Sequence, residues 1–283
     1  MKLGLRYATT YSYDEPVSFS PHDLRLFPRT EQFSRVRRFA LQANGGGSVR
    51  YGRDAFDNVV ASCFFPEQME ELRFDLEIDL ELEEKDAFGF ILESGAVEMP
   101  FVYAPEFAAV LAPYLERQTT DELNVRGWNA PTPGAPVSTV SALVALNQTL
   151  HECIGYERRE EGAAYCPAET LRLGRGACRD VAVLLAEILR GAGLAARLVS
   201  GYLREADSKS RRAEGSLHAW TEVFLPGAGW IGMDATNGVF CNHNFIAAAV
   251  GIRPEHVTPI SVRYFHARKI AAEMTSRLEL LQL

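Results

Sequence analysis

The stretch Gly174-Arg175-Gly176-Ala177-Cys178-Arg179-Asp180 places a cysteine between a glycine-rich turn and a strongly periodic helix. Apolar residues recur behind it at helical spacing: Val181, Leu184, Leu185, Ile188, Leu189 and Ala192. We therefore expect Cys178 in the first helical turn, where unpaired backbone N–H groups and the helix dipole favour an anion. That position lowers the pKa of a thiol and favours the thiolate, which is the nucleophilic form. A small apolar cysteine packed at a helix end would satisfy the same pattern.

Two predicted strands downstream place an imidazole beside a carboxylate. They cover residues 217–224 and 230–234 and are separated by a Pro-Gly turn signal. His218 and Asp234 have the same parity about a turn centred near Pro226, so their side chains share a face. In that register they are directly opposed, roughly 5 Å apart at Cβ, whereas a turn centred one residue later makes them diagonal neighbours that are still within reach. An activated thiol beside an imidazole that a carboxylate orients forms a Cys-His-Asp triad.

Four separate blocks of the sequence agree in order and spacing: Gly176-Ala177-Cys178-Arg179-Asp180, residues 196–202, His218-Ala219-Trp220, and residues 229–237. Together they resemble the transglutaminase-like superfamily, and its bacterial members in particular. Matched motif by motif, the resemblance implies catalytic roles for Cys178, His218 and Asp234. Ala235 is a departure, because the family usually has proline after the aspartate. The departure concerns the local turn and not the triad.

Residues 1–85 have the pattern of a β domain. The predicted strands cover residues 2–13, 35–43, 48–52, 58–65 and 71–82, and Asp14-Glu15-Pro16 is expected to end the first of them. The last strand alternates apolar and acidic residues, which is typical of a half-buried antiparallel strand. Several short strands at this spacing predict a small sandwich. Residues 11–29 also resemble the N-terminal region attached to bacterial transglutaminase-like proteins.

The chain is long enough for two domains, and we place the boundary near residue 90. The predicted fold class is α+β, with an N-terminal antiparallel β-sandwich at residues 1–90. The resemblance implies that residues 91–283 form a papain- or transglutaminase-like α+β catalytic domain. Further elements are expected within this domain, namely a short helix at 105–117, a helix capped by Ser138 or Thr139, a strand at 195–203 and a solvated polar loop at 205–215.

The composition excludes several classes of protein. The formal net charge of −8 argues against non-specific binding to nucleic acid. The N-terminal residues lack the apolar core of a signal peptide, and no stretch approaches the length of a membrane span. We therefore expect a cytoplasmic protein that binds neither nucleic acid nor a membrane, and whose partner is a peptide or protein substrate.

The five cysteines do not indicate a disulfide framework or structural zinc, because they are odd in number and contain no CxxC pair. Cys63 and Cys153 fall at positions expected in the core. Cys241, His243 and His256 lack a recognised spacing of metal ligands. The sequence therefore predicts no metal site and no cofactor.

Catalysis of acyl transfer needs donors aimed at the developing oxyanion. The backbone N–H of Cys178 is one candidate donor. The Tyr165 side chain, just upstream, is a second candidate, although burial of the ring would equally explain its presence there.

The resemblance implies acyl transfer through a thioester. We expect hydrolysis of a peptide or amide bond, the activity of a cysteine peptidase or amidase. Transamidation shares the chemistry up to the thioester and is the alternative within enzymes. A non-catalytic binding or assembly module is the alternative from another class, because one fold can host unrelated functions.

Overall fold

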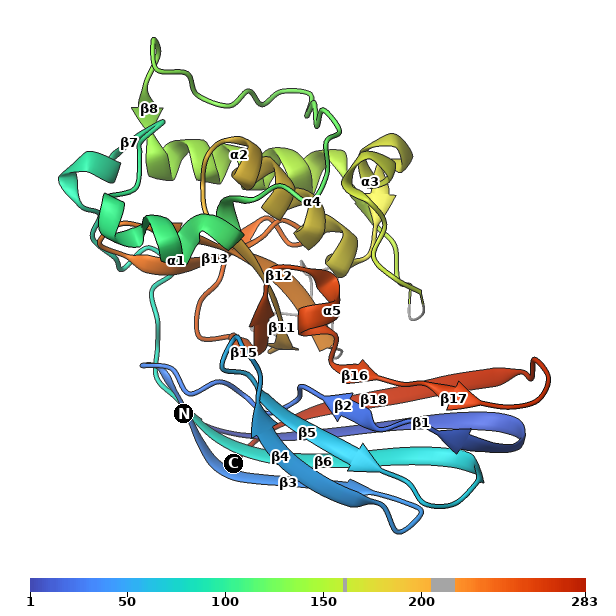
Figure 1. Ribbon diagram of the computed structural model, residues 1–283. Helices are drawn as coiled ribbons and strands as arrows, with labels where there is room; N and C mark the ends of the chain where they lie inside the picture. The colour runs from blue at the N-terminus through green and yellow to red at the C-terminus, as the bar shows by residue number, and fades with distance from the viewer. Residues whose placement is uncertain (160–161, 205–216) are drawn as a thin grey trace.

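A computed structural model of the protein describes residues 1–159, 162–204 and 217–283. Figure 1 shows a β-sandwich below and a mixed unit of helices and strands above it. The fold class is α+β with N-terminal antiparallel sheets, which confirms the prediction. The predicted solvated loop at 205–215 lies outside the described residues.

The sandwich consists of two antiparallel sheets. One sheet contains β1 (Lys2–Phe19), β3 (Ser34–Ala43), β6 (Met69–Leu82), β17 (Tyr264–Phe265) and β18 (Ala272–Gln282), and the other contains β2 (His22–Leu24), β4 (Ser48–Arg53), β5 (Val59–Phe64) and β16 (Ile260–Ser261). Their facing side chains form one core, to which Leu5, Leu24 and Ile78 contribute. In β6 the apolar residues are buried and the acidic residues between them are partly exposed, which confirms the predicted alternation.

Strand β1 continues through Asp14-Glu15-Pro16 to Phe19, so the prediction that these residues end it is wrong. The pairing of β1 with β6 shifts register between Ser12 and Val17. Pro16 lies inside this irregular segment. The regular hydrogen-bond ladder is interrupted there, so the sheet loses no bond because proline lacks an N–H.

The C-terminal strand returns to the N-terminal sheet. Strand β18 pairs with β1 over residues 3–13, and β16 pairs with β2. The last 24 residues, 260–283, therefore carry strands of the sandwich, which differs from the prediction that residues 91–283 form one domain. The mixed unit is inserted between the strands of the sandwich.

The mixed unit is built on a five-stranded antiparallel sheet in the order β14-β13-β12-β11-β15. Its strands are β11 (Ala196–Leu203), β12 (Leu217–Leu225), β13 (Gly229–Asp234), β14 (Val239–Phe240) and β15 (Phe245–Gly251). The helical segments are η1 (Ser94–Ala96), α1 (Pro105–Leu115), α2 (Thr139–Cys153), α3 (Pro167–Leu173), α4 (Cys178–Gly191) and α5 (Pro254–Val257). Two short pairs complete it, β7 (Glu98–Met99) with β8 (Val137–Ser138) and β9 (Gly155–Tyr156) with β10 (Arg175–Gly176).

Helix α4 is the central helix of this unit. Its apolar stripe is buried against the sheet and α2, as the periodicity predicts. Ser138 caps α2 by accepting a hydrogen bond from the Ser141 N–H at 3.4 Å. Cys63 is buried as predicted, but Cys153 is exposed at the end of α2, so its assignment to the core is wrong. No helix in the described part of the chain is both long enough and apolar enough to span a bilayer.

The sandwich is hydrogen-bonded to β15, an edge strand of the five-stranded sheet of the mixed unit. The fully buried Asn58 donates to the Val250 carbonyl of β15 at 2.8 Å and accepts from the Val250 N–H at 2.9 Å. The Arg29 N–H donates to the Ala247 carbonyl of the same strand at 2.7 Å. These bonds satisfy backbone groups of β15 that an exposed edge strand would leave to solvent.

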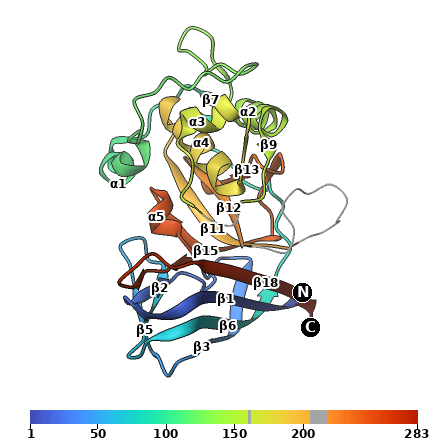
Figure 2. The same cartoon turned by 90° about the vertical axis from the view of Figure 1, so that its right-hand side faces the viewer.

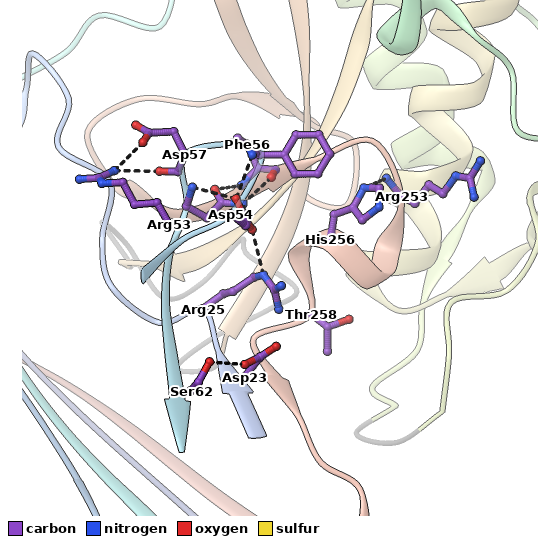
Figure 3. A network of polar contacts seen from close by, with 12 residues as sticks. Asp23, Arg25, Arg53, Asp54, Phe56, Asp57, Ser62, Arg253, His256 and Thr258 are labelled. Carbon is purple, nitrogen blue, oxygen red and sulfur yellow. Dashed lines mark hydrogen bonds and ion pairs between the residues drawn. The ribbon is translucent and has the colours of Figure 1, made fainter. Parts of the chain in front are cut away.

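Asp54 holds the turn that leads to Asn58, and Figure 3 shows Asp54 with Phe56 of this turn and with Arg25. The Asp54 carboxylate accepts from the backbone N–H groups of Phe56 and Asn58 at 2.9 and 3.0 Å, and from the Arg25 side chain of the sandwich at 3.2 Å. The Phe56 ring packs against His256 of α5, with 4.7 Å between the ring centroids. The turn thus connects the sandwich with both β15 and α5.

Replacing Asn58 by alanine should weaken the attachment of the sandwich. Both bonds to Val250 are lost and leave buried backbone groups unsatisfied, so we expect a loss of about 1–3 kcal/mol in the free energy of unfolding. Asn44→Ala is the matched control, because Asn44 makes the same pair of bonds to strand backbone, with the Glu71 carbonyl and the Arg73 N–H, in an exposed position. Urea unfolding measures both variants. Equal losses would contradict a special role for the buried pair.

Candidate active site

Two glycines shape the approach to helix α4. Gly174 ends α3 in the left-handed conformation, at φ 62°, which favours glycine. At Gly176 a Cβ would lie 2.9 Å from the Cβ of Asp180, so a side chain there would clash. Helix α4 begins at Cys178, in agreement with the prediction. Cys178 is partly exposed as a residue and stands in the first helical turn.

A buried carboxylate fixes this approach. Asp180 is fully buried and accepts two hydrogen bonds from one guanidinium nitrogen of Arg159, at 2.6 and 2.8 Å. It also accepts from the backbone N–H groups of Tyr165 and Ala177, at 2.8 and 2.7 Å. The bond to Ala177 satisfies an N–H at the start of the helix. Asp180 therefore ties the segment before α3 to the residue that precedes Cys178.

His218 and Asp234 meet on the β12–β13 hairpin. Thr221 pairs with Met233, which places Asp234 opposite Trp220 and makes it the diagonal neighbour of His218. This is the second of the two registers that the sequence allows. The imidazole Nε2 lies 2.9 Å from a carboxylate oxygen of Asp234, and both side chains are buried.

The turn after β13 orients the carboxylate. The backbone N–H of Thr236 donates to Asp234 at 3.0 Å, and the side-chain amide of Asn237 donates at 2.6 Å. The turn forms with Ala235 in place of the family's proline. Sequence reasoning did not identify Asn237, although a polar residue three positions after the aspartate in a turn is a recognisable signal.

The three side chains perturb one another's ionisation. Burial alone would raise the pKa of the Cys178 thiol, but the interaction with His218 and the positive charge of the imidazolium bring that pKa below the usual value. Burial would lower the pKa of His218, but the charge of Asp234, hydrogen bonding to it and interaction with Cys178 raise the pKa to about 10. Burial opposes ionisation of Asp234, yet the imidazolium and the Asn237 amide hold its pKa below the ordinary range. The directions of these shifts favour a thiolate–imidazolium pair.

A cavity of about 500 Å³ opens onto this group. Cys178 and His218 line it together with Ala219 of β12. Part of the opposite wall comes from the sandwich, through Tyr7 of β1 and Met274 of β18. The site can therefore hold a ligand of substantial size beside the thiol.

The structure gives Tyr165 a different role from the predicted one. Its ring packs on the guanidinium of Arg159, at 3.9 Å, and its backbone N–H donates to Asp180. Tyr165 is not among the residues that line the cavity with Cys178. The N–H group of Cys178 belongs to the first turn of α4, where a helix supplies no acceptor of its own.

The described ranges contain no group of three or more His, Cys, Asp or Glu side chains that could hold a metal ion. Cys241 is buried, and burial raises its pKa well above the usual value. His256 accepts from the Ile252 N–H, and the Lys85 N–H donates to His243.

Comparisons with known proteins agree with this geometry. The family model of the transglutaminase-like superfamily matches residues 127–235, and the model of the bacterial transglutaminase-like N-terminal region matches residues 3–81. The chain thus has a transglutaminase-like core and a bacterial transglutaminase-like N-terminal region. The superfamily core contains Cys178, His218 and Asp234, and the N-terminal region corresponds to most of the sandwich.

Related sequences occur in mycobacteria. An uncharacterized protein of Mycobacterium leprae is 30% identical over 125 residues, which cover 44% of this chain and 44% of the relative. An uncharacterized protein of Mycobacterium tuberculosis is 30% identical over 171 residues, which cover 57% of this chain and 52% of the relative. The chain thus spans about half the length of the curated relatives it matches.

A solved structure has the same fold. The crystal structure of a "Putative Cysteine Protease" from Cytophaga hutchinsonii superposes with a TM-score of 0.72 at 15% identity. The superposition covers 100% of this chain and 91% of the other. The transglutaminase-like fold, with its N-terminal sheets, is therefore shared over the whole of this chain.

Replacing Asp180 by asparagine should loosen the approach to the nucleophile. The variant leaves the Arg159 charge without its buried partner, and we expect a loss of about 3 kcal/mol in the free energy of unfolding. Asp75→Asn is the matched control, because Asp75 also accepts two bonds from one arginine, Arg73, at 2.8 and 2.7 Å, but in an exposed position. Its loss should stay within about 0.5 kcal/mol. Equal effects in chemical denaturation would contradict the buried role of Asp180.

The thiolate–imidazolium pair should be visible in the pH dependence of alkylation. The thiolate forms above the lowered pKa of Cys178, and the imidazolium persists until the pH approaches about 10, the pKa of His218. Iodoacetamide should therefore label Cys178 well below pH 8.5, about where an ordinary thiol ionises. His218→Ala removes the cation and should move the profile to higher pH. An identical profile in the variant would contradict the ion pair.

Proposed function

We propose that the protein is a cysteine-dependent acyl-transfer enzyme that hydrolyses a peptide or amide bond. The observation that carries the proposal is the buried His218–Asp234 pair beside Cys178, at the edge of a cavity large enough for a substrate. The match of residues 127–235 to the transglutaminase-like superfamily and the fold shared with the protein from Cytophaga hutchinsonii support it. A peptide or protein is the proposed partner.

In the first half-reaction the Cys178 thiolate attacks the carbonyl carbon, and a new C–S bond forms. The negative charge that develops on the carbonyl oxygen is directed to the N–H groups of the first turn of α4. The His218 imidazolium gives its proton to the leaving amine as the C–N bond breaks. Asp234 remains ionised and orients the imidazole. The product is a thioester and a free amine.

In the second half-reaction a water molecule attacks the thioester. Neutral His218 accepts a proton from that water, the C–S bond breaks, and the carboxylic acid leaves. A primary amine that attacked instead would give transamidation. Water is always abundant, so an amine competes only when a site holds it near the thioester at high effective concentration. Hydrolysis therefore needs the fewest further assumptions.

Replacing Cys178 by alanine should abolish turnover by several orders of magnitude and leave the fold intact, because triad members act as a unit. Cys166→Ala is the control, since Cys166 is also a cysteine at a helix N-terminus, in the N-cap position of α3, and is exposed. Turnover is measured by mass spectrometry on a library of peptide and isopeptide substrates. Loss of activity in the control, with Cys178→Ala active, would contradict the assignment.

The same assay decides between the two outcomes of the thioester. A glutamine- or amide-containing peptide is incubated with a large excess of a primary amine, and the product mass is determined. We expect the free acid to dominate. Dominant amine adducts would identify the activity as transamidation.

A further inference from the structure

The cavity beside Cys178 lies between two units of the fold and not within one. On the catalytic side it is bordered by α4, β11 and β12, through residues that include Cys178, Leu198 and His218. On the opposite side it is bordered by the sandwich, through Tyr7 and Tyr11 of β1 and through β18. A substrate that fills this cavity therefore contacts the N-terminal sheet.

The wall formed by the sandwich is mainly apolar. Tyr7 is buried, and Tyr11 and Met274 are partly buried. The pairing of Thr9 with Ser276 and of Tyr11 with Met274 places these side chains on one face of the sheet. Ser276 is the small, exposed residue of this wall.

The charged groups at the cavity are engaged with the protein or exposed. Arg159 binds Asp180, and Arg179 donates to the Arg159 carbonyl at 2.7 Å. Arg158 and Glu255, which also line the cavity, are exposed. The lining away from these exposed charges therefore favours apolar groups of a ligand over ionised ones.

Strand β18 is an edge strand. It pairs with β1 on one side, and within the described ranges no strand pairs with its other side. Figure 2 shows β18 as the strand of this sheet that lies nearest to the catalytic unit. The unpaired N–H and C=O groups of an edge strand can bind an extended peptide, with pockets beside the edge receiving alternate side chains.

We propose that this cavity is the substrate's specificity site and binds an extended peptide segment with apolar side chains, next to the bond that is cleaved. Tyr7, Tyr11 and Met274 contact those side chains, and the edge of β18 binds the peptide backbone. The sandwich is thus part of the substrate site. The inference rests on the proposed function, because it takes Cys178 as the reacting group.

The test uses three probes that alkylate Cys178. Acetyl-phenylalanyl-leucyl chloromethyl ketone carries two apolar side chains, acetyl-glycyl-glycyl chloromethyl ketone carries none, and iodoacetamide reports on the thiolate alone. In each reaction the sulfur displaces the halide. Second-order rate constants are measured on the full chain, with mass spectrometry to locate the label, and each ketone rate is divided by the same variant's iodoacetamide rate.

We expect the wild-type protein to favour the apolar dipeptide over the glycyl dipeptide by about tenfold or more, since burial of large apolar side chains favours binding. Ser276→Phe fills the cavity from the wall and should remove most of this preference. Met274→Ala removes an apolar contact and should reduce it, which keeps the test informative if Ser276→Phe does not fold. Thr275→Phe is the matched control, because Thr275 is exposed on the same strand, outside the cavity lining, and alternation turns it to the other face. The control should keep the preference.

A wild-type protein that labels rapidly with iodoacetamide but reacts equally with both ketones would overturn this inference and leave the proposed function standing. The same holds if both Ser276→Phe and Met274→Ala keep the full preference. Slow labelling of Cys178 by iodoacetamide at neutral pH would overturn the proposed function, and this inference with it.

Discussion

The Asp180 carboxylate is the constraint on which the site depends. The carboxylate is buried away from water, and four hydrogen bonds from Arg159, Tyr165 and Ala177 offset the free-energy cost of its desolvation. An ionised carboxylate is stable in such a place only when every lone pair is used. The same bonds bring together two segments that are 21 residues apart and present the first turn of α4 to the cavity. Gly176 has no side chain because Asp180 occupies the space that a Cβ would need.

A second buried pair sets the chemistry. Burial by itself would favour neutral forms of both His218 and Asp234. Their mutual interaction outweighs this effect, so charge is retained in the interior where its field is weakly screened. The imidazolium then stabilises the thiolate of Cys178. The hairpin register, and the turn donors at Thr236 and Asn237, fix the distance on which this balance depends.

The sequence predicted the parts of the site that depend on interactions between residues close together in the chain. The periodic stripe of α4 and the glycines before it located Cys178, and strand parity placed His218 and Asp234 on one face. The sequence did not decide the register between β12 and β13. Moving the centre of the turn by one residue leaves both side chains within reach of each other, so the sequence pattern fits either register. Arg159 was not identified as the partner of Asp180, since nothing local connects them. Strand β18 was not predicted because most of its side chains are exposed and its partner, β1, lies at the other end of the chain.

The return of β18 to the first strand also orders events during synthesis. Strand β1 leaves the ribosome more than 250 residues before its second neighbour, β18, is available, as the bond between Thr9 and Thr275, 266 residues apart, illustrates. Closing so large a loop costs conformational entropy, and the sheet that contains β1 and β18 cannot be completed without this cost. The mixed unit lies within that loop. The Cys178 thiol is therefore translated before the last wall of its cavity exists, and the cavity is completed only when β18 has been made.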